Sequence, residues 1–148
     1  MIPAQAALAR LREGNLRYVA DDPVGCLCIG HERRSQLLVG QEPFAIILGC
    51  SDSRVPAEII FDQGLGDLFV IRVAGNIVAS SQIASVEYAV DRLGVPLVAV
   101  LGHTGCGAVA ATLQELEVPA EKRSVGLRSI VSRIRPSVET LMETDLRN

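Results

Sequence analysis

The stretch Phe44–Gly49 (FAIILG) decides the fold, because a continuous apolar run of this kind is typical of a strand covered on both faces. Two similar runs follow, Leu68–Ala74 (LFVIRVA) and Leu97–Gly102 (LVAVLG). Between these two, Ser81–Leu93 has apolar residues at a period near 3.6, and Gly94 stands where such a helix is expected to end. Strands separated by helices predict an α/β fold with a central, mainly parallel β-sheet flanked by helices.

Other parts of the chain have the pattern of helices. The segments are Pro3–Ala20, Glu32–Val39, a stretch from Gly105–Cys106 to Leu116, and the amphipathic Leu127–Arg135. Gly14 interrupts the first segment and is expected to break it into two pieces. Gly40 should end the second, and the last segment reaches Pro136.

The length and composition of the chain describe one globular unit. Its 148 residues suit a single domain, which we divide into an N-terminal helical arm, 1–40, and an α/β core, 41–148. Hydrophobic residues make up 49% and charged residues 21%, which excludes a disordered chain. A net charge of −3 and an aromatic content of 3% argue against nucleic acid or an anionic membrane as a partner.

The sequence also indicates the cellular location of the chain. The apolar runs are far shorter than the about 20 residues that cross a bilayer. The start of the chain lacks the basic and then apolar segments of a secretory signal, so we expect a cytoplasmic location and no membrane partner. In that compartment the four cysteines do not imply disulfides, and they are better explained as metal ligands, catalytic thiols or small core residues.

Two cysteines and a histidine stand where strands end or a helix begins. Cys50 ends the first strand, His103 ends the third, and Cys106 begins the next helix. In parallel sheets, functional groups gather outside the carboxyl ends of the strands, so these three side chains can meet. Three such ligands with one free position are typical of a catalytic zinc site. The alternative is that each cysteine is a small core residue and the histidine a hydrogen-bonded one.

Asp52 and Arg54 follow Cys50 closely. A carboxylate beside a metal can bind the ion or accept a hydrogen bond from its water, and an arginine can hold that carboxylate through two bonds and keep it ionised. The alternative is a surface ion pair in a turn, which contributes little to stability.

The motifs around these residues resemble those of the β-class carbonic anhydrases. The matching segments are Cys50–Arg54 (CSDSR), Val55–Asp62 (VPAEIIFD), Gly64–Asn76 (GLGDLFVIRVAGN), Glu87–Val90 (EYAV) and Gly102–Ala108 (GHTGCGA). The similarity extends to Gly14–Asn15 and Gln41–Pro43, and it covers about residues 5–116. The paired CSDSR and GHTGCG motifs are highly specific.

The resemblance implies a role for each residue of the candidate metal site. It implies that one Zn²⁺ per chain is bound by Cys50, His103 and Cys106. Asp52 and Arg54 match the catalytic dyad of the family. In many relatives the aspartate can instead bind the zinc after the arginine releases it, so Asp52 is also a candidate metal ligand.

The resemblance also implies a substrate pocket. Gln41 matches the glutamine that hydrogen-bonds CO2 or bicarbonate, and Gly107 lets the backbone approach the metal. Phe69 and Tyr88 match aromatic residues of an apolar pocket that is completed across a dimer interface, and Ala74 matches a further pocket position. We therefore expect a homodimer or a higher homo-oligomer.

The function implied by the resemblance is the reversible hydration of CO2 to bicarbonate and a proton by zinc-bound hydroxide. One alternative is hydrolysis of carbonyl sulfide or carbon disulfide, which are linear and apolar like CO2. Another is a truncated, non-catalytic zinc-binding dimer, because the family usually continues with a further helix and a last strand. The core 41–148 is thus expected to lack the usual last strand region and to leave an exposed strand edge.

Three other candidate residues are interpreted as having no catalytic role. His31 lies in a polar stretch, HERR, and is expected to be a solvated surface histidine rather than a proton shuttle. Cys26 and Cys28 form a C-x-C pair without a second pair nearby, and we interpret them as non-ligands.

Overall fold

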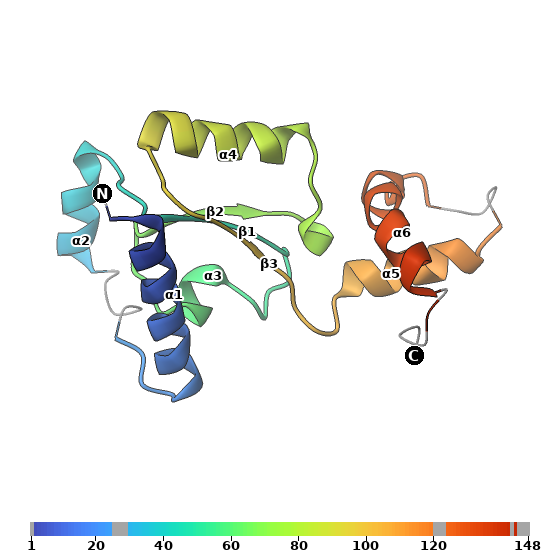
Figure 1. Ribbon diagram of the computed structural model, residues 1–148, viewed down its shortest axis with the longest axis horizontal. Helices are drawn as coiled ribbons and strands as arrows, with labels where there is room; N and C mark the ends of the chain where they lie inside the picture. The colour runs from blue at the N-terminus through green and yellow to red at the C-terminus, as the bar shows by residue number, and fades with distance from the viewer. Residues whose placement is uncertain (1, 25–29, 120–123, 143, 145–148) are drawn as a thin grey trace.

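The sheet of the computed structural model confirms the α/β prediction (Figure 1). The structure describes residues 2–24, 30–119, 124–142 and 144. Strands β1 (Ala45–Gly49), β2 (Leu68–Arg72) and β3 (Val98–Leu101) form a parallel sheet in the order β2-β1-β3. Because all three strands run the same way, their carboxyl ends lie at one edge of the sheet.

Strand β1 lies in the middle of the sheet and is buried along its whole length, as the sequence predicts. Its side chains alternate between two clusters. Ile47 packs in the cluster that includes α1 (Ala4–Val19), and Ile46 packs in the cluster that includes α4 (Ser80–Leu93). Helix α4 covers one face of the sheet, and α1 covers the other together with α3 (Ala57–Ile60) (Figure 1).

Strand β3 is not covered on both faces, which corrects the expectation from its apolar run. Val98 and Val100 are 42% and 65% exposed, whereas Ala99 and Leu101 pack against the cluster beneath α1. The register puts Val98 beside Ile46, on the face that α4 covers. Helix α4 packs on β1 and β2, so the outer strand on that face stays uncovered.

Helix α1 is continuous, so the predicted break at Gly14 is wrong. A side chain there would put its first carbon 1.8 Å from the carbonyl oxygen of Phe61. Glycine therefore lets the helix approach the α3 segment, and the next residue, Asn15, donates a hydrogen bond to the Ile60 carbonyl at 2.9 Å. The gain from this close packing outweighs the low helix propensity of glycine, about 1 kcal/mol.

The second predicted helix consists of two short elements, α2 (His31–Gln36) and the 3-10 helix η2 (Leu37–Val39). They end at Gly40, as expected. Helix α3 has no counterpart among the predicted helices, because its four residues are too few to show a period. Helix α4 ends at Gly94, as predicted, and the φ of 65° there is that of a left-handed cap.

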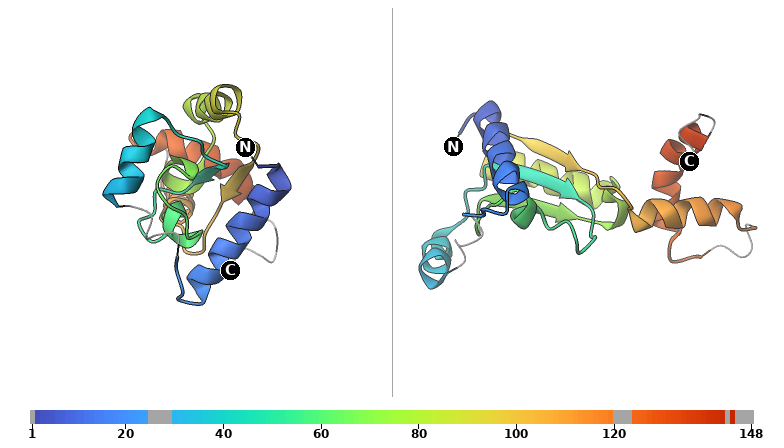
Figure 2. Two further views of the ribbon diagram at one scale, coloured as in Figure 1. Left: turned by 90° about the vertical axis from the view of Figure 1, so that its left-hand side faces the viewer. Right: turned by 90° about the horizontal axis from the view of Figure 1, so that it is seen from below.

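Helices α5 (Gly107–Glu117) and α6 (Arg128–Met142) lie beyond the carboxyl edge of the sheet (Figures 1 and 2). Helix α6 continues through Pro136, where the predicted segment ended. Ile134 and Val138, on either side of the proline, are buried. Packing of α6 on α5 and on the 3-10 helix η3 (Ala74–Asn76) thus offsets the hydrogen bond that proline removes. None of the helices in the described residues is long and apolar enough to span a membrane.

Candidate metal centre

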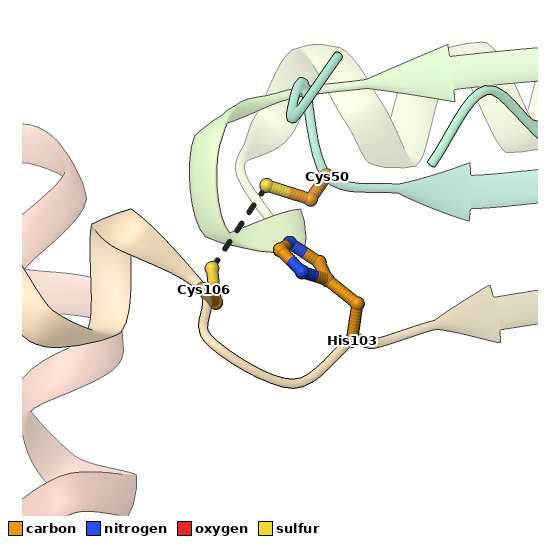
Figure 3. Close-up of side chains that lie close together, drawn as sticks. All are labelled: Cys50, His103 and Cys106. Carbon is orange, nitrogen blue, oxygen red and sulfur yellow. Dashed lines mark hydrogen bonds between the residues drawn. The ribbon is translucent and has the colours of Figure 1, made fainter. Parts of the chain in front are cut away.

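Three predicted residues meet at the carboxyl edge of the sheet (Figure 3). Cys50 follows β1 directly, His103 follows β3, and Cys106 is the residue before the first turn of α5. One nitrogen or sulfur atom from each lies within 4.8 Å of those of the other two, and the two Sγ atoms are 3.9 Å apart. The parallel sheet thus brings together residues that are 53 positions apart in sequence, as His103 and Cys50 are.

The geometry of this group fits a metal ion. Two sulfur atoms that each lie about 2.3 Å from a tetrahedral ion are about 3.8 Å apart, close to the separation of Cys50 and Cys106. Nδ1 of His103 is 3.0 Å from the Thr104 carbonyl, and because a carbonyl only accepts, Nδ1 is the donor. Nε2 then keeps its lone pair, and it is buried without a hydrogen-bond partner among the described residues. These three residues could therefore hold a metal ion.

The surroundings of Cys50 favour its thiolate. Burial raises the pKa of this thiol, but the adjacent His103 imidazole and the N–H of Gly75, 3.3 Å from Sγ, lower the pKa to about 7. The pKa of His103 is raised, chiefly by the Cys50 sulfur. A cation between the two residues would therefore bind a sulfur that loses its proton more readily than an ordinary cysteine thiol.

The Asp52–Arg54 pair lies directly beside this group. The Arg54 guanidinium donates to both carboxylate oxygens, from Nε at 2.9 Å and from Nη2 at 2.7 Å. These bonds hold the pKa of Asp52 well below its usual range. One carboxylate oxygen is 3.9 Å from Nε2 of His103, and Arg54 also donates to the Gly105 carbonyl at 3.2 Å. The pair therefore links the two loops that carry the candidate ligands.

Gly107 and Ala74 are close to this site in the fold. Gly107 is the first residue of α5, and a Cβ atom added to it would meet nothing within 4 Å, so no described neighbour within the chain demands a glycine there. Ala74 begins η3, next to the Gly75 whose N–H contacts Cys50.

The other predicted pocket residues lie away from the metal site of their own chain. Gln41 precedes β1 whereas Cys50 follows it, and the five residues of that strand separate them by roughly 16 Å. Gln41 lines a hollow of about 480 Å³ beside α2 and η2. Phe69 pairs with Ile46 in the sheet, near the amino end, and its ring is 6.2 Å from that of Tyr88. One chain therefore does not bring these three side chains to the metal site.

Of the remaining sequence candidates, His31 lies outside the site. His31 is exposed at the start of α2, which agrees with the interpretation of a surface histidine. Cys26 and Cys28 lie outside the described residues, and their interpretation as non-ligands stays a prediction.

Two contacts to the site were not predicted from the sequence. Gly75 donates its backbone N–H to Cys50, and Arg72 donates to the carbonyls of Cys50 and Asp52. The sequence does not show which backbone N–H groups donate hydrogen bonds to a side chain. Arg72 lies near the end of the predicted strand 68–74, but only the strand register shows that this position is next to Cys50.

Comparisons with known proteins give the family. The family model for carbonic anhydrase matches residues 45–148. The carbonic anhydrase of Mycolicibacterium smegmatis is 50% identical over 133 residues, which are 90% of this chain and 64% of that protein. The chain thus spans less than two thirds of the length of this curated relative.

Solved structures agree with this match. The β-carbonic anhydrase CafA of Aspergillus fumigatus has a TM-score of 0.66 and 32% identity, over 94% of this chain and 62% of that one. A structure of two tetrameric β-carbonic anhydrases from Sordaria macrospora has a TM-score of 0.53 and 27% identity, over 76% of this chain and 71% of that one. The sequence match and the shared fold lead to one conclusion: this chain belongs to the β-class carbonic anhydrase family.

Proposed function

We propose that this chain catalyses the reversible hydration of CO2 to bicarbonate and a proton, with one Zn²⁺ bound by Cys50, His103 and Cys106. The observation that carries the proposal is the convergence of these three donor atoms within 4.8 Å, with the Asp52 carboxylate beside them. Two sulfurs and one imidazole nitrogen suit zinc and leave one of four tetrahedral positions for water or substrate. Membership of the family supports the same activity.

The residues of the chain have distinct tasks in this reaction. A bound zinc ion would lower the pKa of a water ligand towards about 7 and so supply a nucleophile at neutral pH. Asp52 accepts a hydrogen bond from the reacting water and so orients a lone pair of the water oxygen towards CO2. Arg54 keeps that carboxylate ionised and fixes its direction through two bonds.

Asp52 is placed to accept a hydrogen bond rather than to bind the metal in this arrangement. Both of its carboxylate oxygens receive donors from Arg54. Binding of the ion by Asp52 therefore requires Arg54 to release it, and we propose this second state as the closed form of the site.

The second half of the pocket is proposed to come from another copy of the chain. Gln41, Phe69 and Tyr88 lie away from the metal site of their own chain, so they can act on the substrate only at the site of a partner. Exposed apolar side chains near these residues support an interface: Tyr88 is 52% exposed, and Leu38 and Val39 are 85% and 96% exposed. In the pocket, Gln41 would donate to the substrate oxygen that gains negative charge. We propose a homodimer, or a higher assembly of dimers, in the cytoplasm.

Mixed dimers test the shared pocket. Gln41→Ala and Cys106→Ala chains with different tags are co-expressed, and the dimer that carries both tags is purified. One of its two sites then has both an intact metal centre and an intact glutamine, so we expect about half of the wild-type activity per dimer. Each variant alone should be nearly inactive. If the mixed dimer is no more active than its parents, the shared pocket is refuted.

Assays of CO2 hydration and sulfide release test the proposed reaction. We expect the zinc-loaded protein to hydrate CO2 and the metal-free protein to lose that activity, with recovery when zinc is restored. Hydrolysis of carbonyl sulfide or carbon disulfide is the alternative on the same scaffold and is measured as hydrogen sulfide in parallel. Zinc-loaded protein that hydrates no CO2 would refute the proposal, and sulfide release would then favour the alternative.

A further inference from the structure

Arg72 contacts the backbone of the metal site from the neighbouring strand. It is the last residue of β2 and pairs with Gly49, the last residue of β1. Its Nε donates to the carbonyl oxygen of Cys50 at 3.0 Å, and its Nη2 donates to the carbonyl oxygen of Asp52 at 2.6 Å. One side chain therefore links the main chain of a candidate metal ligand, Cys50, to the main chain of the candidate catalytic residue, Asp52.

We propose that Arg72 is a positioning residue of the metal centre, which fixes the path of the chain from Cys50 to Asp52. The inference rests on the proposed function, since it is the metal and the substrate that need this path to be fixed. It concerns the main chain of the loop, whereas the resemblance to the family assigns roles to the side chains of Cys50, Asp52 and Arg54.

The sheet alone does not hold this loop. Beyond β1, the ladder with β2 continues through the N–H of Ser51, which donates to Val73 at 3.3 Å. The chain then turns, and the carbonyl of Asp52 accepts the N–H of Val55 at 3.2 Å. Arg72 reaches this loop from the sheet, so its side chain adds a link between the Asp52 main chain and β2 beyond the last ladder bond at Ser51.

Arg54 cannot replace this link. It lies two residues after Asp52 in the same loop, so their ion pair can move with the loop as one body. Outside the loop it donates to the carbonyl of Gly105, which belongs to another loop rather than to the sheet. Arg54 thus orients the Asp52 carboxylate, while Arg72 holds the Asp52 main chain to β2.

The chemistry of the contact requires arginine. The carbonyls of residues i and i+2 in an extended chain point the same way, so those of Cys50 and Asp52 can face a single partner. The guanidinium offers two donors in a fixed plane, whereas a lysine ammonium is a point charge on a flexible stem. Because Arg72 is exposed, water competes for these bonds and they add little to stability. Its removal should therefore change the site more than the fold.

Three arginine variants test this proposal. Arg72→Met removes both donors, and Arg72→Lys keeps the charge without the two donors in a fixed plane. Arg92→Met changes an exposed arginine on α4 and is the matched control. We measure zinc release to a chelator, the visible spectrum of the Co²⁺-substituted protein, kcat and KM for CO2, and amide hydrogen exchange at Val55 in the metal-free protein.

In Arg72→Met we expect zinc release to be about tenfold faster and kcat about tenfold lower, as for other groups that orient metal-site residues. KM should change little, the Co²⁺ spectrum should shift, and exchange at Val55 should be faster. Arg72→Lys should recover only part of these changes, and Arg92→Met should match the wild type. The melting temperatures of the metal-free variants should agree within a few degrees.

Zinc release and Val55 exchange at wild-type rates in Arg72→Met would overturn the proposal, and so would full recovery in Arg72→Lys. The outcome is separable from that of the proposed function. If the wild type binds zinc but hydrates no CO2, the zinc release rates and the Co²⁺ spectra still test whether Arg72 positions the metal centre. If it binds no zinc, faster exchange at Val55 in Arg72→Met supports the link to β2, and unchanged exchange refutes it.

Discussion

Replacing Cys106 by alanine is expected to abolish zinc retention and CO2 hydration in a chain that still folds. Structural zinc sites gain about 10–16 kcal/mol from four ligands, so one ligand is worth roughly 3 kcal/mol, or about two orders of magnitude in affinity. Cys106 is only partly buried and precedes α5, so its loss should cost the fold little. The zinc content, measured by metal analysis after dialysis, should fall from one zinc per chain to almost none.

The controls for this variant separate loss of a ligand from loss of a cysteine. Cys28→Ala should keep its zinc, because Cys28 is interpreted as a non-ligand. Cys50→Ala should also lose the metal, but Cys50 is buried at the end of the central strand, so that variant should be less stable as well. If Cys106→Ala retains one zinc per chain with wild-type activity, the ligand assignment is wrong.

Asp52→Asn is expected to lower kcat/KM by about two orders of magnitude while zinc stays bound, as for general acid–base groups. An amide has the same size as the carboxylate, but it has one acceptor oxygen and no charge, so it cannot receive both donors of Arg54. Stopped-flow CO2 hydration, with metal analysis on the same samples, measures both quantities.

The pH dependence sharpens this test. Because Arg54 holds the pKa of Asp52 well below its usual range, the carboxylate is ionised at neutral pH and stays so on moderate acidification. The loss in Asp52→Asn should therefore be the same factor in mildly acidic and mildly alkaline buffer. Asp91→Asn, an exposed carboxylate on α4, serves as the control and should leave the rate unchanged. A rate for Asp52→Asn within twofold of the wild type would exclude Asp52 from the reaction.

Local patterns in the sequence predicted most of the elements correctly. The apolar runs became strands within one or two residues at each end, and the period of 81–93 became a helix with its cap at Gly94. These features depend on neighbours along the chain, which are visible in the sequence. The ends of the strands then indicated where Cys50, His103 and Cys106 could meet.

The errors of the sequence interpretation arose where packing overrode local preference. Gly14 stays helical because the helix must approach Phe61, and Pro136 stays helical because Ile134 and Val138 are buried on both sides of it. Val98 and Val100 are apolar but exposed, since α4 lies over the other two strands. Propensity and hydropathy do not say which surface a residue will face.

The sequence by itself determined the α/β class, the family motifs and the three residues that could hold a metal. The tertiary structure decided how these parts are placed. It brought Cys50, His103 and Cys106 close together. It also placed Arg72 in contact with the loop that carries Asp52, and it separated Gln41 from the metal site of its own chain. The physical reason is that the direction and register of parallel strands decide which ends meet, and both are set by hydrogen bonds between distant segments.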